Sequence, residues 1–216
     1  MSDETDRSAP PRPTLEEVAS LAGVSIATVS RVLNESAPVS PSTRAAVVEA
    51  VAHLGYVPNP AARSLVRRRT DTIALVLSEP ESLIFSDPFF ATVVHGVLAA
   101  VADTELQVVL LLAQGERQQA KVERYVRHRH VDGLILMALH AGDTFADRLA
   151  DANVPIVLVG RPQSSQRLPY VDADNRAGAR EATELLLASG RTRVATITGP
   201  LDMNVAADRF DGYRDA

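Results

Sequence analysis

Residues 25–34 contain the side chains in this sequence that are best suited to contact DNA. If this run is a helix, its inward residues are Val29, Val32 and Leu33, and its outward residues are Ile26, Ala27, Ser30 and Arg31. Small apolar side chains gain nothing from water, but they can meet thymine methyl groups in a major groove, where an arginine can donate to guanine or phosphate. The outward face therefore favours a DNA-reading helix, although a plain three-helix bundle would bury the same inward residues.

The remaining reactive residue types form no recognisable catalytic or metal-binding set. The chain has no cysteine, which excludes a thiol nucleophile, an iron–sulfur cluster and a Cys-based zinc site. His128 and His130 are two residues apart, and such side chains on a helix point in different directions. Neither a G-x-G-x-x-G nor a Walker phosphate loop occurs. Asp172 and Asp174 alternate on an extended segment, which is more typical of a crossover between two lobes than of an acid/base pair. We therefore expect no enzyme activity, no cofactor and no metal.

Three short helices must position the candidate DNA-reading residues. Thr14 is a helix-capping residue followed by acids, and Gly23 can end that helix in the left-handed conformation. Ser25 can cap the second helix, and a third begins at Ser40 and stops at Gly55. Two short helices joined by a glycine turn and packed on a third are typical of a helix-turn-helix.

Beyond residue 70 the sequence alternates between short apolar runs and amphipathic stretches. The predicted strands are 73–77, 108–112, 134–137, 156–159 and 194–197, and the predicted helices are about 88–102, 116–130, 143–153 and 175–189. Nearly continuous apolar strands that alternate with helices indicate a parallel sheet covered on both faces. We therefore predict a doubly wound α/β domain after the small all-α head.

The charged residues also divide the chain near residue 70. The net charge is −5, which argues against a protein that coats nucleic acid through bulk charge. Residues 1–70 nevertheless carry 8 basic and 7 acidic side chains, whereas residues 71–216 carry 14 and 20. No run approaches 18 apolar residues, and the first 13 residues are polar and proline-rich, so we expect no membrane span, no secretory peptide and a cytoplasmic location.

Several motifs resemble those of the LacI/GalR-family repressors. They are TLEEVA and AGVSIATVSRVLN within residues 14–34, VSPSTR at 39–44, LGYVPN at 54–59, AARSL at 61–65, DPFF at 87–90, VDGLIL at 131–136, and the stretches 171–178 and 196–200. The resemblance covers residues 14 to 216. It implies a helix-turn-helix head, a hinge helix and a sensor of the type I periplasmic-binding-protein kind.

The resemblance also implies a role for each residue that would face DNA. Ile26, Ala27 and Arg31 would face base edges, and Ser25, Thr28, Ser30, Asn34 and Thr43 would touch phosphates. Asn59, Ala62 and Leu65 of the hinge helix would also lie at the DNA, with Leu65 inserted into a base step from the minor groove. Packing of Leu65 between the two hinge helices of a dimer is the alternative.

For the sensor, the resemblance implies effector contacts from Asp87, Phe89, Phe90, Arg161 and Arg209. The two aromatic residues would sandwich a sugar or a base, and Arg209 would hydrogen-bond effector oxygens. Asp87 stands where the family commonly has Asn, and Gly160 stands where many relatives have Asp. Each phenylalanine has a second interpretation as a core residue, and Arg161 as a surface residue.

From these observations we predict a regulator, with a repressor as the leading interpretation. The expected divisions are a disordered leader at 1–13, the helix-turn-helix at 14–58, the hinge at 59–70, the first sensor lobe at 71–172 and the start of an incomplete second lobe at 173–216. The partners would be palindromic operator DNA, a sugar-like or nucleobase-like effector, and a second copy in a homodimer or higher oligomer. The protein would join the nucleoid when DNA-bound, and the chain would continue beyond residue 216. A free-standing solute-binding protein and a Rossmann-like enzyme are the alternatives.

Overall fold

The computed structural model describes residues 13–34, 37–57, 69–137, 140–162 and 167–216. The chain divides into two compact units, residues 1–68 and residues 69–216. All of the predicted leader except Pro13, and all of the predicted hinge except Arg69 and Thr70, lie outside the described residues.

The described residues of the first unit form three helices with the predicted ends. They are α1 (Leu15–Ala22), α2 (Ile26–Asn34) and α3 (Pro41–Leu54). Thr14 forms a reciprocal capping box with Glu17, in which each side chain bonds the other residue's backbone N–H. Gly23 and Gly55 end α1 and α3 with φ of 65° and 62°, a conformation that only glycine adopts at little cost. The predicted helix-turn-helix is confirmed.

One valine from each helix forms the centre of this unit. Val18, Val29 and Val47 are fully buried, and the partly buried Leu33 and Leu54 pack around them. Three fully buried valines contribute several kcal/mol of hydrophobic stabilisation, at about 1.5–3 kcal/mol each. Burial of Val29 fixes which face of α2 points outward.

The second unit contains a five-stranded parallel sheet with the order β2-β1-β3-β4-β5. The strands are β1 (Thr72–Leu77), β2 (Gln107–Leu112), β3 (Gly133–Met137), β4 (Ile156–Val159) and β5 (Tyr170–Val171). Four of the five predicted strands are therefore confirmed, and β5, a two-residue edge strand, was not predicted.

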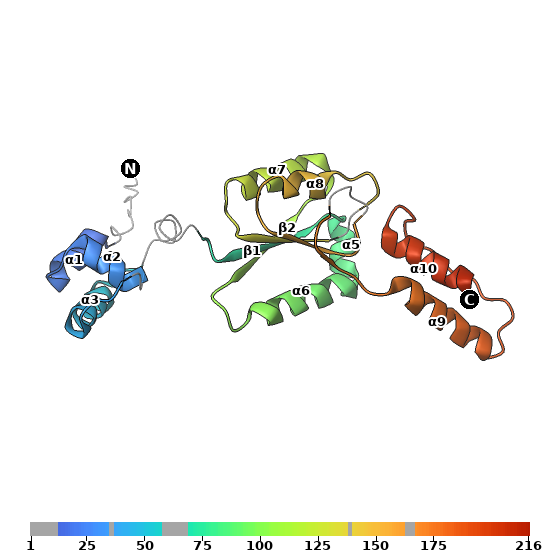
Figure 1. Ribbon diagram of the computed structural model, residues 1–216, viewed down its shortest axis with the longest axis horizontal. Coiled ribbons are helices and arrows are strands. Elements are labelled where there is room, and N and C mark those ends of the chain that lie inside the picture. Colours follow the sequence, from blue (N-terminus) through green and yellow to red (C-terminus); the bar gives the residue numbers. More distant parts are fainter. Residues whose placement is uncertain (1–12, 35–36, 58–68, 138–139, 163–166) are drawn as a thin grey trace, which may run out of the picture. The chain divides into compact units, whose positions relative to one another are not determined.

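Helices cover both faces of this sheet, as Figure 1 shows. One face carries α7 (Gly115–Arg127) and α8 (Phe145–Ala150), and the other carries α6 (Pro88–Val101), preceded by the short α5 (Glu81–Ser86). Alternate residues of β1 serve the two sides: Ala74 and Val76 pack in the core with α7 and α8, whereas Leu75 and Leu77 pack in the core with α6. The prediction of a doubly wound parallel sheet is confirmed.

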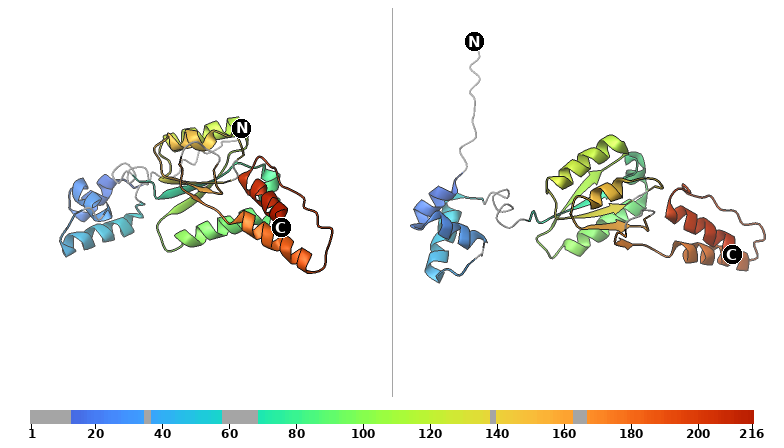
Figure 2. Two further views of the ribbon diagram at one scale, coloured as in Figure 1. Left: turned by 45° about the vertical axis from the view of Figure 1, so that its right-hand side comes forward. Right: turned by 45° about the horizontal axis from the view of Figure 1, so that its top comes forward.

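After β5 the chain forms a helical pair, α9 (Asn175–Ala188) and α10 (Asn204–Asp215), which lie side by side in both views of Figure 2. The helices approach closely at Gly212, where a β-carbon would collide with the carbonyl oxygen of Arg176. The strand predicted at 194–197 is wrong, because these residues are irregular and Ile197 is fully exposed. An apolar run becomes a strand only when a neighbouring strand accepts its hydrogen bonds, and no described strand lies beside this one.

Candidate DNA-binding and effector-binding sites

The outward face of α2 presents the residue types that the sequence indicated. Ile26 is 44% exposed, and Ala27 and Arg31 are also exposed, while Val29 and Val32 on the opposite face are buried. The short turn that Gly23 permits leads directly from α1 into this helix. The head therefore exposes two apolar side chains, which gain nothing from water, beside one guanidinium on the same face of α2.

Hydroxyl and amide groups surround this face, and several already have partners. The Ser25 hydroxyl accepts a hydrogen bond from the backbone N–H of Thr28 at 3.2 Å and contacts its hydroxyl at 2.9 Å. Asn34 donates to the backbone carbonyl of Ser30 at 2.9 Å. The hydroxyl of Thr43 lies 2.8 Å from that of Ser40, the N-cap of α3. These bonds orient the polar groups at the starts of α2 and α3 and along α2. Asn59, Ala62 and Leu65 lie outside the described residues.

The candidate effector residues Asp87, Phe89 and Phe90 lie at the start of α6, beyond the carboxyl end of β1. Asp87 caps α6 and accepts a hydrogen bond from the backbone N–H of Phe89 at 2.9 Å. The two rings contact each other edge to face, with centroids 5.7 Å apart. They differ in burial, because Phe89 is 52% exposed whereas Phe90 is 6% exposed and packs in the core beneath α6. Phe89 is therefore accessible to a ligand, and the buried ring of Phe90 packs against it.

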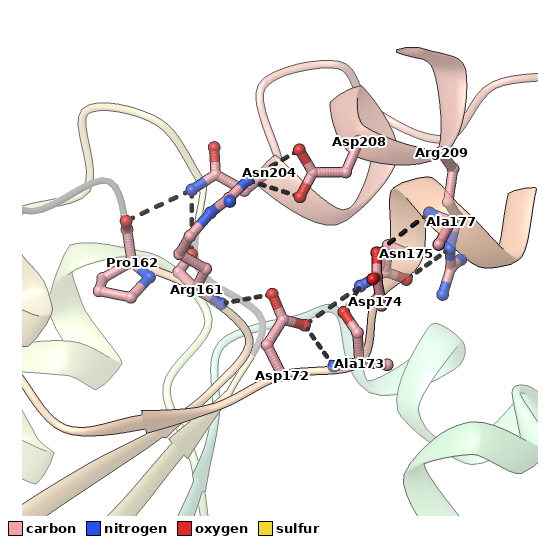
Figure 3. A network of polar contacts seen from close by, with 10 residues as sticks. All are labelled: Arg161, Pro162, Asp172, Ala173, Asp174, Asn175, Ala177, Asn204, Asp208 and Arg209. Atoms are coloured by element: carbon pink, nitrogen blue, oxygen red, sulfur yellow. Dashed lines mark hydrogen bonds and ion pairs between the residues drawn. The ribbon is translucent and has the colours of Figure 1, made fainter. Parts of the chain in front are cut away.

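The other two candidates, Arg161 and Arg209, belong to one polar network, shown in Figure 3. Arg161 follows β4, and one of its terminal nitrogens donates to both carboxylate oxygens of Asp208, at 2.7 and 2.5 Å. Its backbone N–H lies 3.3 Å from the carboxylate of Asp172, and its carbonyl accepts from Asn204 at 3.0 Å. The residue thus ties the end of β4 to the start of α10.

Arg209, on α10, is held differently. Its Nε donates to the side-chain oxygen of Asn175 at 2.9 Å, and Asn175 in turn donates to Asp172 at 3.1 Å. Asp172 therefore connects the backbone of Arg161 with the side chain that holds Arg209 (Figure 3). The structure brings these two arginines onto one network, and no hydrogen bond among the described residues connects Asp87, Phe89 or Phe90 to it.

A second polar cluster lies at the point where the sheet changes winding direction, between β1 and β3. Glu79 follows β1 and is only 7% exposed, and its carboxylate lies 3.1 Å from Nε2 of His140, which follows β3. Nδ1 of His140 lies 2.8 Å from the carboxylate of Asp202, and the backbone N–H of Ala141 donates to the carbonyl of Asp202 at 2.8 Å. Ligands of open α/β sheets bind at such switch points.

Two opposing effects set the protonation of His140. Burial disfavours the imidazolium, but hydrogen bonds to Asp202 and Glu79 and the charges of both carboxylates outweigh it, so the pKa of His140 is raised above its ordinary value of 6.5. Next to Glu79, the hydroxyl of Ser78 is buried without a hydrogen-bond partner among the described residues. This edge of the sheet therefore carries both a charged cluster and an unsatisfied donor.

Sequence reasoning did not find this second cluster or Asn175. Glu79, His140 and Asp202 are far apart in sequence and meet only through the strand order. The available signal was the position of Glu79, directly after the first buried strand, since polar residues there face the ligand edge of a parallel sheet. For Asn175 the signal was its position one residue after the helix-capping Asp174. Among the described residues, no group of three His, Asp or Glu side chains could hold a metal ion, and no helix is long and apolar enough to cross a membrane.

Comparison with known families tests the resemblance to the LacI/GalR-family repressors. Residues 14–59 match the model of bacterial regulatory proteins of the lacI family, and residues 70–216 match that of periplasmic binding proteins and the sugar-binding domain of the LacI family. The chain belongs to the LacI family. Residues 60–69 separate the two matched segments, and the boundary between the two compact units falls in this interval, so each unit has a LacI-family counterpart.

Individual LacI-family relatives agree over most of the chain. The HTH-type transcriptional regulator CelR of Thermobifida fusca is 48% identical over 207 residues, which are 95% of this chain and 61% of that protein. MalR of Streptococcus pneumoniae is 32% identical over 94% of this chain and 62% of its own length. The present chain thus spans about three fifths of the length of these relatives, which are named as transcriptional regulators.

Solved LacI-family structures match in the same proportion. A CelR–cellobiose complex is 45% identical with a TM-score of 0.64, and a Lac repressor dimer bound to operator and the anti-inducer ONPF is 28% identical with a TM-score of 0.78. Each match covers 95% of this chain and 61% of the other. The predicted resemblance to LacI-type regulators is confirmed.

Proposed function

We propose that this protein is a sequence-specific DNA-binding regulator of transcription, a repressor, whose DNA affinity changes when a small sugar binds to its sensor. The observation that carries the proposal is the exposed face of α2, on which Ile26, Ala27 and Arg31 lie opposite a buried valine core. The two apolar side chains of this face gain nothing from water, and together with Arg31 they suit contacts to base edges in a major groove.

In this proposal each group on the head has a distinct task. Arg31 donates to a guanine edge, and Ile26 and Ala27 contact thymine methyl groups, so these residues select sequence. Ser25, Thr28, Ser30, Asn34 and Thr43 bind phosphates and set the position of α2. Asn59, Ala62 and Leu65 contact the centre of the site from the minor groove. Two copies of the protein read the two halves of an inverted repeat, and this role places the protein at the bacterial nucleoid.

The sensor is proposed to bind a neutral sugar at the carboxyl edge of the sheet. Phe89 supplies an exposed aromatic face, against which the apolar face of a sugar ring can stack, and Arg209 supplies charged donors for its oxygens. Cellobiose is the first candidate, because the CelR–cellobiose complex is 45% identical to this chain. Asp87 orients α6 through its capping bond. Arg161, which is held by Asp208 at the end of β4, contributes a further contact to the sugar.

A DNA shift assay with added ligand tests this function. The full-length protein is mixed with an inverted repeat found beside its gene, and cellobiose, other sugars and nucleobases are titrated in turn. We expect specific binding that changes with one sugar, and loss of specificity in the Arg31→Ala variant. Ligand binding without any DNA affinity would identify a free-standing solute-binding protein, and turnover of the ligand would identify an enzyme.

A further inference from the structure

Asn175 is a buried polar residue whose side-chain amide is fully engaged. It is the first residue of α9 and is 8% exposed. Its amide nitrogen donates to the Asp172 carboxylate at 3.1 Å and to the carbonyl of Ala173 at 3.0 Å, and its amide oxygen accepts from Nε of Arg209 at 2.9 Å (Figure 3). A buried amide is tolerated because each of its groups has a partner.

These partners fix the direction of the amide. Rotation by half a turn would place the amide oxygen of Asn175 against the carboxylate of Asp172 and the carbonyl of Ala173, which are both acceptors. The same rotation would turn the amide nitrogen toward the guanidinium of Arg209, which has only donors. The oxygen of Asn175 therefore faces Arg209 in the one arrangement that satisfies all of the groups.

The bond to Asn175 involves only Nε of the Arg209 guanidinium. The two terminal nitrogens of Arg209 make no hydrogen bond to the part of the chain that the structure describes. The neighbouring cation, Arg161, is instead paired with the carboxylate of Asp208. Arg209 is therefore a guanidinium with a fixed plane and with donors still available, which is the form that binds paired oxygens well.

We infer that Asn175 is a positioning residue for effector recognition: it holds the Arg209 guanidinium so that its terminal nitrogens are directed at two oxygens of the sugar. The inference rests on the proposed function, in which Arg209 contacts the effector. Holding the side chain in advance removes part of the entropy that an exposed arginine would lose on binding. Asp172 completes the arrangement, because the same carboxylate also accepts from the backbone N–H of Arg161.

A double-mutant cycle with cellobiose as the probe tests the inference in the full-length protein. Affinity is measured by calorimetry for Asn175→Ala, Arg209→Ala and the double variant. We expect Asn175→Ala to weaken cellobiose binding roughly tenfold, Arg209→Ala to weaken it more, and the double variant to match Arg209→Ala alone. Asn175→Ser provides a second test if Asn175→Ala folds poorly. Serine retains a small polar group near Ala173 that cannot reach Arg209, so this variant should weaken cellobiose binding by the amount expected for Asn175→Ala.

Asp174→Ala is the matched control, because Asp174 caps the same helix through the N–H of Ala177 but does not contact Arg209. Its effect on affinity should multiply with that of Arg209→Ala, as expected for independent sites. Multiplying effects of Asn175→Ala and Arg209→Ala would overturn the inference. An unchanged affinity in Arg209→Ala would instead overturn the proposed effector role of Arg209.

A second readout needs no ligand. The Nε–H of Arg209, identified in a ¹⁵N–¹H NMR spectrum by its loss in Arg209→Lys, should exchange slowly with water in the unaltered protein and rapidly in Asn175→Ala. Slow exchange that persists in Asn175→Ala would show that Asn175 does not hold the guanidinium. Failure of the unaltered protein to bind cellobiose would reject that sugar as the effector, while the exchange measurement would still decide the role of Asn175.

Discussion

Nε2 of His140 lies 3.1 Å from the carboxylate of Glu79, although the two residues follow different strands on either side of the switch point of the sheet. The other ring nitrogen of His140 is 2.8 Å from the carboxylate of Asp202, just before α10. One imidazole therefore connects the end of β1, the end of β3 and the approach to α10. The strength of this connection depends on the charge of the ring.

We expect this connection to weaken as the pH rises. The pKa of His140 is raised in the folded protein, so the folded state binds the proton more tightly than the unfolded state does. The stabilisation is complete below the ordinary pKa of 6.5 and is lost as the pH rises through the raised value. The melting temperature of His140→Gln should therefore fall furthest below that of the unaltered protein at about pH 5.5 and approach it at about pH 8.5.

The control for this prediction is His95→Gln, because His95 is an exposed residue of α6. This variant shows how the melting temperature responds to loss of an imidazole that does not contact Glu79 or Asp202. A gap for His140→Gln that stays constant across the range would mean that the proton on His140 does not stabilise the fold.

Gly212→Ala should destabilise the helical pair. A β-carbon at this position would collide with the carbonyl oxygen of Arg176 and lie 3.0 Å from the backbone nitrogen of Arg180, so α9 and α10 would have to separate. We expect a loss of about 1–3 kcal/mol in the free energy of unfolding, measured by denaturant titration. Gly178→Ala is the matched variant, because nothing lies within 4 Å of its added carbon, and it should gain roughly 0.5–1 kcal/mol. Equal effects of the two substitutions would show that the helices do not touch at Gly212.

Arg31→Ala should weaken binding to the operator by about 1–3 kcal/mol and leave binding to unrelated DNA nearly unchanged, because a base contact carries sequence information and a phosphate contact does not. Fluorescence titrations at two salt concentrations, with both DNAs, measure the difference. Val48→Ala, an exposed residue of α3, should bind like the unaltered protein. If Arg31→Ala lost the same amount on both DNAs, Arg31 would be a phosphate contact and not a reader of bases.

Thr14→Ala should loosen the first turn of α1, because it removes the hydroxyl oxygen that accepts a hydrogen bond from the backbone N–H of Glu17. Loss of such a cap costs about 1 kcal/mol. Amide exchange should become faster in that turn while the first turn of α3 keeps its rate. Ser40→Ala, which removes the cap of α3, should give the reverse pattern. Equal acceleration in both turns by either substitution would mean that the head opens only as a whole.

The sequence predicted those parts of the fold that depend on local patterns. Capping residues and glycines gave the ends of α1 and α3, and the apolar runs of β1 to β4 were long enough to be recognised. Two strand assignments failed for one physical reason, since strands require partners. The apolar run 194–197 has no described neighbour and stays irregular, whereas the exposed pair Tyr170–Val171 forms β5 because β4 lies beside it.

The candidate sites show the same limit. The outward face of α2 follows from helical spacing alone, so Ile26, Ala27 and Arg31 could be proposed from the sequence. The contact of His140 with Glu79 and that of Asn175 with Arg209 span 61 and 34 residues, and no periodicity encodes a meeting at that separation. The sequence left a core position open for both Phe89 and Phe90, and it could not tell which of the two is buried, because neighbouring aromatic residues on a helix differ only in which side the sheet covers.

The attachments of α10 have a mechanical consequence. Asn204 and Asp208 in its first half are bonded to Arg161 beyond β4, whereas Asp215 at its far end is bonded to Arg176 of α9. The helix α10 is therefore bonded at both ends, and tilting it would break the bonds at one end. A ligand that breaks the bonds between Arg161 and α10 would leave α10 bonded to Arg176 of α9, so the two helices would move together.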